Sequence, residues 1–163
     1  METISLKSEK ISEQGQRRMR RNLFAAFADA CKTHGKTKEI VTDGDGRILT
    51  YAEIMRAAFA LSSPLKKYTK RNEAVGILLP TGAGAVISLF ALHAAGRIPA
   101  MLNFSAGVQN LKAAAQTGQL KSIITARKFI EVGGLSTLID ALSGELNIIY
   151  LDCLLYTSPS PRD

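Results

Sequence analysis

Apolar and polar positions alternate in blocks along the second half of the chain, and these blocks predict strands and helices in turn. Four short segments are almost continuously apolar and predict strands at 74–79, 98–103, 121–125 and 146–151. Helical spacing between them predicts helices at 83–95, 107–117 and 127–142. Strands that are apolar on both faces are typical of a parallel sheet covered by helices on both sides. The predicted fold class is α/β, with a mainly parallel sheet flanked by helices.

The first part of the chain predicts two helices around a hairpin. Residues 18–35, RMRRNLFAAFADACKTHG, carry apolar side chains at helical spacing and end in a glycine. Residues 38–51, KEIVTDGDGRILTY, contain two β-favouring runs joined by an Asp-Gly-Asp-Gly turn. A helix follows from Ala52 to about Leu61 or Lys66, and the Ser-Ser-Pro run at 62–64 predicts its end or a kink. Residues 1–17 lack apolar periodicity and are expected to form a mobile arm.

An uncharged stretch at 74–96 is long enough to cross a bilayer. A proline and two glycines divide it into a short strand and a helix, so we interpret it as the interior of a soluble domain. The first residues are polar and show no signal-peptide pattern. Cys31 and Cys153 lie far apart in sequence, which suggests a reducing compartment. We expect a cytoplasmic protein. If it attaches to a membrane, we expect peripheral attachment at the inner face.

Positive charge exceeds negative charge along the chain. The 163 residues include 21 Lys and Arg and 14 Asp and Glu, for a formal net charge of +7. Basic residues gather within 7–21, 32–38 and 66–71. Such clusters form a solvated face, or they attract an acidic partner such as anionic lipid or an acidic carrier protein. No aromatic side chains are interleaved with them, so we expect no nucleic-acid partner.

Four arginines before the first apolar positions of the chain's first predicted helix favour a second, non-enzymatic hypothesis. Arg17, Arg18, Arg20 and Arg21 lead directly into an amphipathic stretch with apolar residues at 23, 24 and 27. A basic segment followed by an apolar helical face suits docking on a membrane interface. The partner expected for these arginines is an anionic membrane surface.

Two short motifs have local structural explanations. In LTYAEI, Thr50 and Glu53 have the spacing of a capping box, which marks a helix start. In LPTGAGAV, Gly82 and Gly84 stand between a strand and a helix, as in a dinucleotide-binding fingerprint. Ile87 occupies the position of the third glycine. We attribute both glycines to close strand–helix packing, with nucleotide binding as the alternative.

No catalytic, cofactor-binding or metal-ligating residue can be assigned from the residues themselves. The chain offers no Ser-His-Asp order, nucleophile elbow or metal cluster. His34 and His93 have no partner at ligand spacing. Asp43 and Asp45 lie in the hairpin turn, where aspartate favours the turn geometry. The sequence specifies no active site.

Several stretches together resemble the N-terminal region of adenylate-forming acyl ligases. LTYAEI looks like the first signature of that superfamily, Leu-Thr-Tyr-x-Glu-Leu, and VGILLPTGAGAVISLFALHAAGRIPAMLN looks like its next block. GRIPAMLNFSAGVQNL followed by KSIITARKFIE is similar to the fatty-acid–acyl-carrier-protein ligase half of bacterial bifunctional 2-acylglycerophosphoethanolamine acyltransferases. The resemblance covers roughly residues 20–152.

The resemblance implies a ligase that uses ATP and Mg²⁺ to activate a long-chain fatty acid as an acyl-adenylate. The acyl group would then pass to the thiol of an acyl-carrier protein or of CoA, for phospholipid acylation. The family keeps its phosphate loop, nucleotide contacts and catalytic lysine downstream of the matched residues, so no site residue carries over. The matched motif residues are expected to be structural: Thr50, Tyr51, Glu53, Gly96, Pro99 and Asn103.

The last residues depart from the family's phosphate loop. The loop would read Tyr-Thr-Ser-Gly, whereas Pro159 follows Tyr-Thr-Ser here and removes both an amide and the φ freedom of glycine. CLLYTSPSPRD resembles a sequencing-adapter read-through peptide. We therefore divide the chain into a mobile basic arm at 1–17, a partial N-terminal α/β subdomain of an acyl ligase at 18–152, and a non-native scar at 153–163.

This interpretation makes the chain a part of an enzyme without the catalytic motifs. We expect it to bind neither ATP nor Mg²⁺ and to lack adenylation activity by itself. An incomplete parallel sheet leaves an unpaired edge and uncovered apolar surface, which predicts marginal solubility. The alternatives are a part of a general acyl-CoA synthetase and a non-catalytic α/β domain that binds a nucleotide or a lipid surface.

Overall fold

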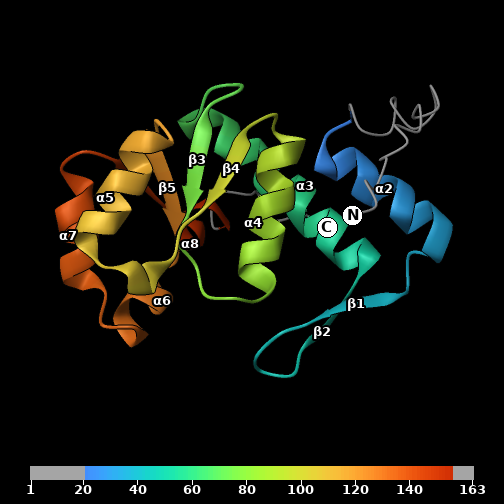
Figure 1. Ribbon diagram of the computed structural model, residues 1–163. Coiled ribbons are helices and arrows are strands. Elements are labelled where there is room, and N and C mark those ends of the chain that lie inside the picture. Colours follow the sequence, from blue (N-terminus) through green and yellow to red (C-terminus); the bar gives the residue numbers. More distant parts are fainter. Residues whose placement is uncertain (1–20, 156–163) are drawn as a thin grey trace, which may run out of the picture.

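Four short parallel strands lie at the centre of the molecule, in the order β4-β3-β5-β6 (Figure 1). The computed structural model describes residues 21–155. The strands are β3 (Ala74–Ile77), β4 (Ile98–Met101), β5 (Ser122–Thr125) and β6 (Asn147–Tyr150). Each strand lies within its predicted segment, and the predicted α/β fold with a mainly parallel sheet is confirmed.

Helices cover both faces of this sheet (Figure 1). One face packs against α3 (Tyr51–Tyr68) and α4 (Ala83–Ala94), and the other against α5 (Val108–Thr117), α6 (Arg127–Val132) and α7 (Ser136–Ser143). The neighbours Ile123 and Ile124 are both fully buried, the first in the α5–α7 core and the second in the α3–α4 core. Burial on both sides explains why the strands are almost entirely apolar.

The uncharged stretch at 74–96 folds into β3 and α4, as the interpretation of a strand followed by a helix requires. Both elements contribute to the core, where Val75, Ile77 and Leu92 are fully buried. Across the described residues, none of the helices combines the length and apolar character that a bilayer span needs.

The remaining elements flank this core. They are α2 (Leu23–His34), β1 (Glu39–Thr42), β2 (Ile48–Thr50), the short 3₁₀ helix η1 (Phe104–Ala106) and α8 (Leu151–Leu155). The antiparallel hairpin is confirmed, with a hydrogen bond of 2.9 Å from Gly46 N to Asp43 O in its turn. Helix α2 begins after Asn22, whose Oδ1 accepts from Ala25 N at 2.8 Å. The predicted start at residue 18, the arm at 1–17 and the tail beyond 155 lie outside the described residues.

Of the two predicted ends of α3, at about Leu61 or about Lys66, the first is wrong, because the helix continues through Pro64 to Tyr68. A proline in a helix interior costs roughly 3 kcal/mol. Leu61 and Leu65 are buried on the inner face of α3, and burial of a leucine contributes about 1.5–3 kcal/mol each. The packing of this half of the helix therefore outweighs the missing amide.

The single helix predicted at 127–142 is also wrong, because two glycines divide it into α6 and α7. Gly134 has a φ of 61°, in the left-handed region that glycine adopts without strain. A Cβ on Gly133 would lie 2.9 Å from the carbonyl oxygen of Phe129. The chain turns at these glycines, and both α6 and α7 can then pack on the same face of the sheet.

The buried side chain of Arg97 joins the C-termini of α3 and α4. Its Nε donates to Oγ1 of Thr69 at 2.9 Å, and its two terminal nitrogens donate to the main-chain oxygens of Thr69 and Ala95. Thr69 is the C-cap of α3 and Ala95 is the C-cap of α4. A cation at these positions offsets the negative end of each helix dipole.

We expect Arg97→Met to lower the free energy of unfolding by about 2–3 kcal/mol, because it leaves buried carbonyl oxygens without a donor. Arg97→Lys should lose less, since the ammonium keeps the charge but cannot span both helix ends. Urea denaturation of the 163-residue chain measures both changes. Arg47→Met, at an exposed arginine, is the matched control and should change stability by less than about 0.5 kcal/mol. Equal effects of Arg97→Met and Arg47→Met would contradict the bridging role.

Candidate functional site

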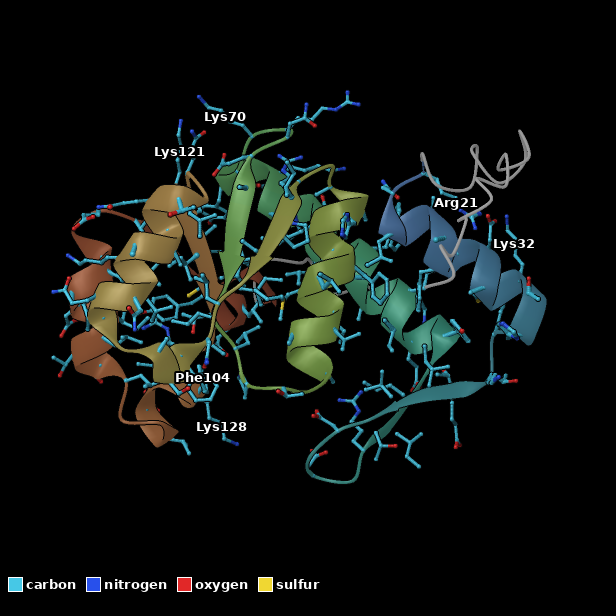
Figure 2. The ribbon with its side chains drawn as sticks, in the orientation of Figure 1. Arg21, Lys32, Lys70, Phe104, Lys121 and Lys128 are labelled. Atoms are coloured by element: carbon cyan, nitrogen blue, oxygen red, sulfur yellow. The ribbon has the colours of Figure 1, made fainter. Side chains whose placement is uncertain are left out.

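The strand order creates a crevice at the carboxyl edge of the sheet. The chain leaves β3 through α4 and reaches β4 on one side, whereas it leaves β5 through α6 and α7 and reaches β6 on the other. The connections therefore diverge beyond the adjacent ends of β3 and β5, which is where open parallel sheets bind ligands. Phe104 lies at this edge of the molecule (Figure 2).

A cleft of about 410 Å³ opens at this edge, next to the end of β3. Its walls are the loop at 79–82, the first turns of α4 and residues 101–104 after β4. Thr81 and Asn103 are the polar residues of this lining, and its other residues are apolar or glycine. The cleft can hold an apolar group, and its lining provides no acid, base or charged group for catalysis.

The N-terminus of α4, beside this cleft, is occupied by the side chain of Asp43. Its Oδ1 accepts from the amide of Ala83, the first residue of α4, at 3.2 Å and from Gly44 N at 3.0 Å. A Cβ on Gly82 would lie 2.4 Å from the same oxygen, so this approach requires glycine at position 82. Close packing explains Gly82, but its packing partner is Asp43 of the β1–β2 hairpin. The expected partner was the strand before α4. Gly84 faces open space.

The described residues do not fit the phosphates of a nucleotide at α4. A phosphate at a helix N-terminus needs free amides and the positive end of the dipole. Here the Asp43 carboxylate already takes that position, and it would repel a second anion. Within residues 21–155, no group of three or more His, Cys, Asp or Glu side chains is placed to hold a metal ion.

The family-type motif at 49–54 forms the start of α3. Thr50 N donates to Oε2 of Glu53 at 2.8 Å, and Glu53 N donates to Oγ1 of Thr50 at 3.3 Å, so the predicted capping box is confirmed. The hydrogen bond from the Thr50 main chain, followed by the one from its side chain, lowers the pKa of Glu53. The Tyr51 ring packs 5.1 Å from that of Phe27. These contacts are structural.

Gly96 and Asn103 also have structural roles. Gly96 has a φ of 74°, and its carbonyl accepts from Asn72 N at 2.8 Å, which connects the end of α4 to the loop before β3. Asn103 Oδ1 accepts from the amide of Ser105 at 3.0 Å and caps η1. The side-chain carbonyl of Asn103 is therefore engaged within the protein, although Asn103 lines the cleft.

A second polar group lies at the ends of β5 and β6. The amide of Arg127 donates to Oδ2 of Asp152 at 2.8 Å, and its guanidinium lies 4.6 Å from the centre of the Tyr150 ring. The pKa of Arg127 is raised, and the largest cause is its hydrogen bond to the Cys153 thiol. Oγ1 of Thr125 donates to Leu78 O at 2.9 Å, which connects β5 to the end of β3. These side chains stabilise the carboxyl edge.

The two histidines are in separate places. His93 lies in the last turn of α4, where burial lowers its pKa and favours the neutral imidazole. The ring of His34 stacks on Tyr51, with ring centres 6.3 Å apart. The structure therefore does not bring the two residues together into a site.

Comparison with protein families identifies one match across most of the chain. The family model described as AMP-binding enzyme matches residues 27–156. That range includes the hairpin, the capping box, all four parallel strands and the cleft.

Comparison with solved structures finds the same fold in several proteins. The N-terminal subdomain of Klebsiella oxytoca NpsA matches with a TM-score of 0.70 at 14% identity, over 88% of this chain and 34% of that one. VinN matches with a TM-score of 0.68 at 20% identity, over 84% and 35%. Bacillus subtilis o-succinylbenzoate CoA synthetase, in complex with its acyl-adenylate intermediate, matches with a TM-score of 0.70 at 14% identity, over 86% and 34%. The chain thus spans about a third of the length of these proteins.

We expect Gly82→Ala to lower the free energy of unfolding by about 1 kcal/mol, because the new methyl group displaces Asp43 from the N-terminus of α4. Asp43→Ala should cost a similar amount, and the double variant should cost little more than either single one, since both remove the same contact. Denaturant titration of the four proteins measures this coupling. Gly84→Ala is the control and should be stabilising by about 0.5–1 kcal/mol. Additive losses at 43 and 82 would contradict the contact.

Proposed function

The chain belongs to the AMP-binding enzyme family, and we propose that it is part of an adenylate-forming ligase. Such an enzyme joins a carboxylate to the AMP portion of ATP, releases pyrophosphate and then transfers the acyl group to a thiol. The family match over residues 27–156 carries this proposal. The fold supports it, because the structures it resembles include a synthetase bound to an acyl-adenylate.

We further propose a long-chain fatty acid as the substrate and an acyl-carrier protein as the thiol partner, with phospholipid acylation as the role. The support is the resemblance of residues 96–131 to the carrier-protein ligases. In the structure this segment forms β4, η1, α5, β5 and the start of α6, and its first part lines the cleft. A CoA thiol is the alternative acceptor. ATP and Mg²⁺ are the cofactors proposed for the whole enzyme, since the family match supports an ATP-dependent ligase.

We expect ATP–pyrophosphate exchange with the protein read from the DNA on both sides of this sequence, and none above background with the 163-residue chain. The physical reason is that the described residues place a carboxylate, and no cation, at the helix N-terminus beside the cleft. Exchange is measured with long-chain fatty acids and, as controls, with aromatic acids.

Three outcomes of this assay are informative. Stimulation by aromatic acids alone would leave the ligase proposal intact and contradict the fatty-acid proposal. Absence of exchange with every acid in the longer protein would contradict both. Exchange by the 163-residue chain would show that its own residues bind the nucleotide, against the geometry at Asp43.

An anionic membrane surface is the partner proposed for Arg17, Arg18, Arg20 and Arg21. Of these four residues, only Arg21 is described, and it pairs with Asp29 on α2. Leu23 follows with 44% of its surface exposed, whereas Phe27 is buried and cannot enter a membrane. The apolar part of the proposed contact is therefore Leu23, and attraction between the arginines and acidic headgroups supplies most of the binding.

We expect the 163-residue chain to sediment with vesicles that contain phosphatidylglycerol and to be released at high salt. Each basic residue near an anionic surface contributes about 1 kcal/mol, so replacing Arg17, Arg18 and Arg20 with glutamine should weaken binding by at least about tenfold. The control replaces Lys66, Lys67 and Lys70 with glutamine, which removes the same charge elsewhere. Equal losses in both triple variants, or failure to bind at any salt concentration, would contradict a specific role for the arginines.

A further inference from the structure

A groove of about 660 Å³ lies between α2 and α3, away from the sheet. Its floor and sides are mostly apolar and include Phe24 of α2 and Met55 and Phe59 of α3. Two basic residues, Lys36 and Arg56, line it as well. Its volume is in the range of sites for small organic ligands. Phe59 has 67% of its surface exposed, which is unusual for a large aromatic side chain.

The two helices run in opposite directions, and this makes the two ends of the groove chemically different. The rings of Phe24 and Phe59 lie 6.3 Å apart, so the start of α2 meets the middle of α3. At the other end, Ala52 N donates to Lys36 O at 3.0 Å, so the segment after α2 meets the start of α3. From Ala52 to Phe59, α3 rises about 11 Å. The groove therefore has an aromatic end and, at Lys36, a basic end. Arg56 lies about 6 Å along α3 from Ala52, and its side chain inclines toward the basic end because helical side chains tilt toward the N-terminus of their helix.

The positive charges at the basic end are not neutralised by ion pairs. Arg21, just before α2, and Lys32, on α2, both pair with Asp29 (Figure 2). Among residues 21–155, no carboxylate forms an ion pair with Lys36 or Arg56. Glu53, one turn before Arg56, directs its carboxylate to Thr50 in the capping box. The charge of Arg56 is the last of the causes that lower the pKa of Glu53, so Glu53 offsets part of that charge. Neither cation is held in an ion pair within residues 21–155, and both can meet an anion at this end.

We propose that this groove binds a single-chain anionic amphiphile, a medium-chain carboxylate. The carboxylate lies between Lys36 and Arg56, and the alkyl chain runs along Met55 to Phe24 and Phe59. The charge complementarity at one end and the apolar lining at the other identify this class of ligand. The proposal rests on the groove alone and does not depend on the proposed ligase function.

The distribution of charge favours a monomeric ligand over a membrane or a partner helix. A segment that lies on a membrane carries cations along the whole polar border of its apolar face. An amphipathic partner helix needs apolar anchors repeated over several turns. Here the groove is only about two turns of α3 long, and its cations are Lys36 at one end and Arg56, whose side chain inclines toward that end.

The test is a titration of the 163-residue chain with octanoate below its micelle concentration, followed by heteronuclear NMR. We expect amide shifts confined to α2, residue 36 and the first half of α3. Lys36→Gln combined with Arg56→Gln should weaken octanoate binding by about tenfold and leave binding of the neutral analogue 1-octanol unchanged. Ala60→Glu places a carboxylate at the aromatic end and one turn from Arg56, where it would compete with octanoate for that cation, so it should abolish binding of octanoate. Arg47→Gln, outside the groove lining, is the matched control.

Several results would overturn the proposal. One is equal octanoate affinity in wild type and in the Lys36→Gln, Arg56→Gln variant. Another is that no octanoate binds, or that the chain binds only vesicles and not the monomer. Shifts that appear with protein concentration in the absence of octanoate would identify a second copy of the chain as the occupant. None of these readouts involves ATP, so failure here is distinguishable from failure of the ligase proposal.

Discussion

Helix α4 contains no Asp, Glu, Lys or Arg, and burial lowers the pKa of its histidine. Its dipole is nevertheless compensated at both ends. Asp43 supplies a carboxylate to its N-terminus, and Arg97 supplies a guanidinium to its C-terminus. Both come from other elements, one from the hairpin and one from the residue before β4. These two contacts anchor both ends of the most apolar helix of the fold. Ser88 is the only polar residue on the buried face of α4. The position of α4 in turn sets the distance between β3 and the hairpin.

This arrangement determines what the carboxyl edge can bind. In many α/β proteins the helix after the first strand leaves its amides free for a phosphate. Here the hairpin supplies an internal anion, and glycine at position 82 makes room for it. The cleft beside it is lined mainly by apolar residues, and its lining contains no charged side chain. The N-terminus of α4 is therefore not free to receive a phosphate.

The fold could be predicted from local patterns, whereas the contacts between distant segments could not. The four strands, the hairpin and the Thr50–Glu53 capping box follow from apolar runs, turn residues and a spacing of three. Local patterns leave the end of α3 open between about Leu61 and Lys66, because the burial of Leu65 cannot be read from a local proline signal. The sequence indicates only a turn role for Asp43. Its contact with Ala83 joins residues 40 positions apart, and a local pattern cannot predict such a contact. Gly133 and Gly134 were a local signal that the helical pattern around them obscured.

Strand β4 lies at one edge of the sheet and illustrates how a proline can protect an open edge. The amides of Ile98 and Leu102 donate to β3, so by alternation the amides at 99 and 101 would face outward. Position 99 is proline and has no amide hydrogen, which leaves Met101 as the only outward donor of β4. An added strand would find half of the usual donors here. Any strand that does pair with β4 must therefore adopt a register that tolerates the missing amide at position 99. Random self-association along this edge is weakened.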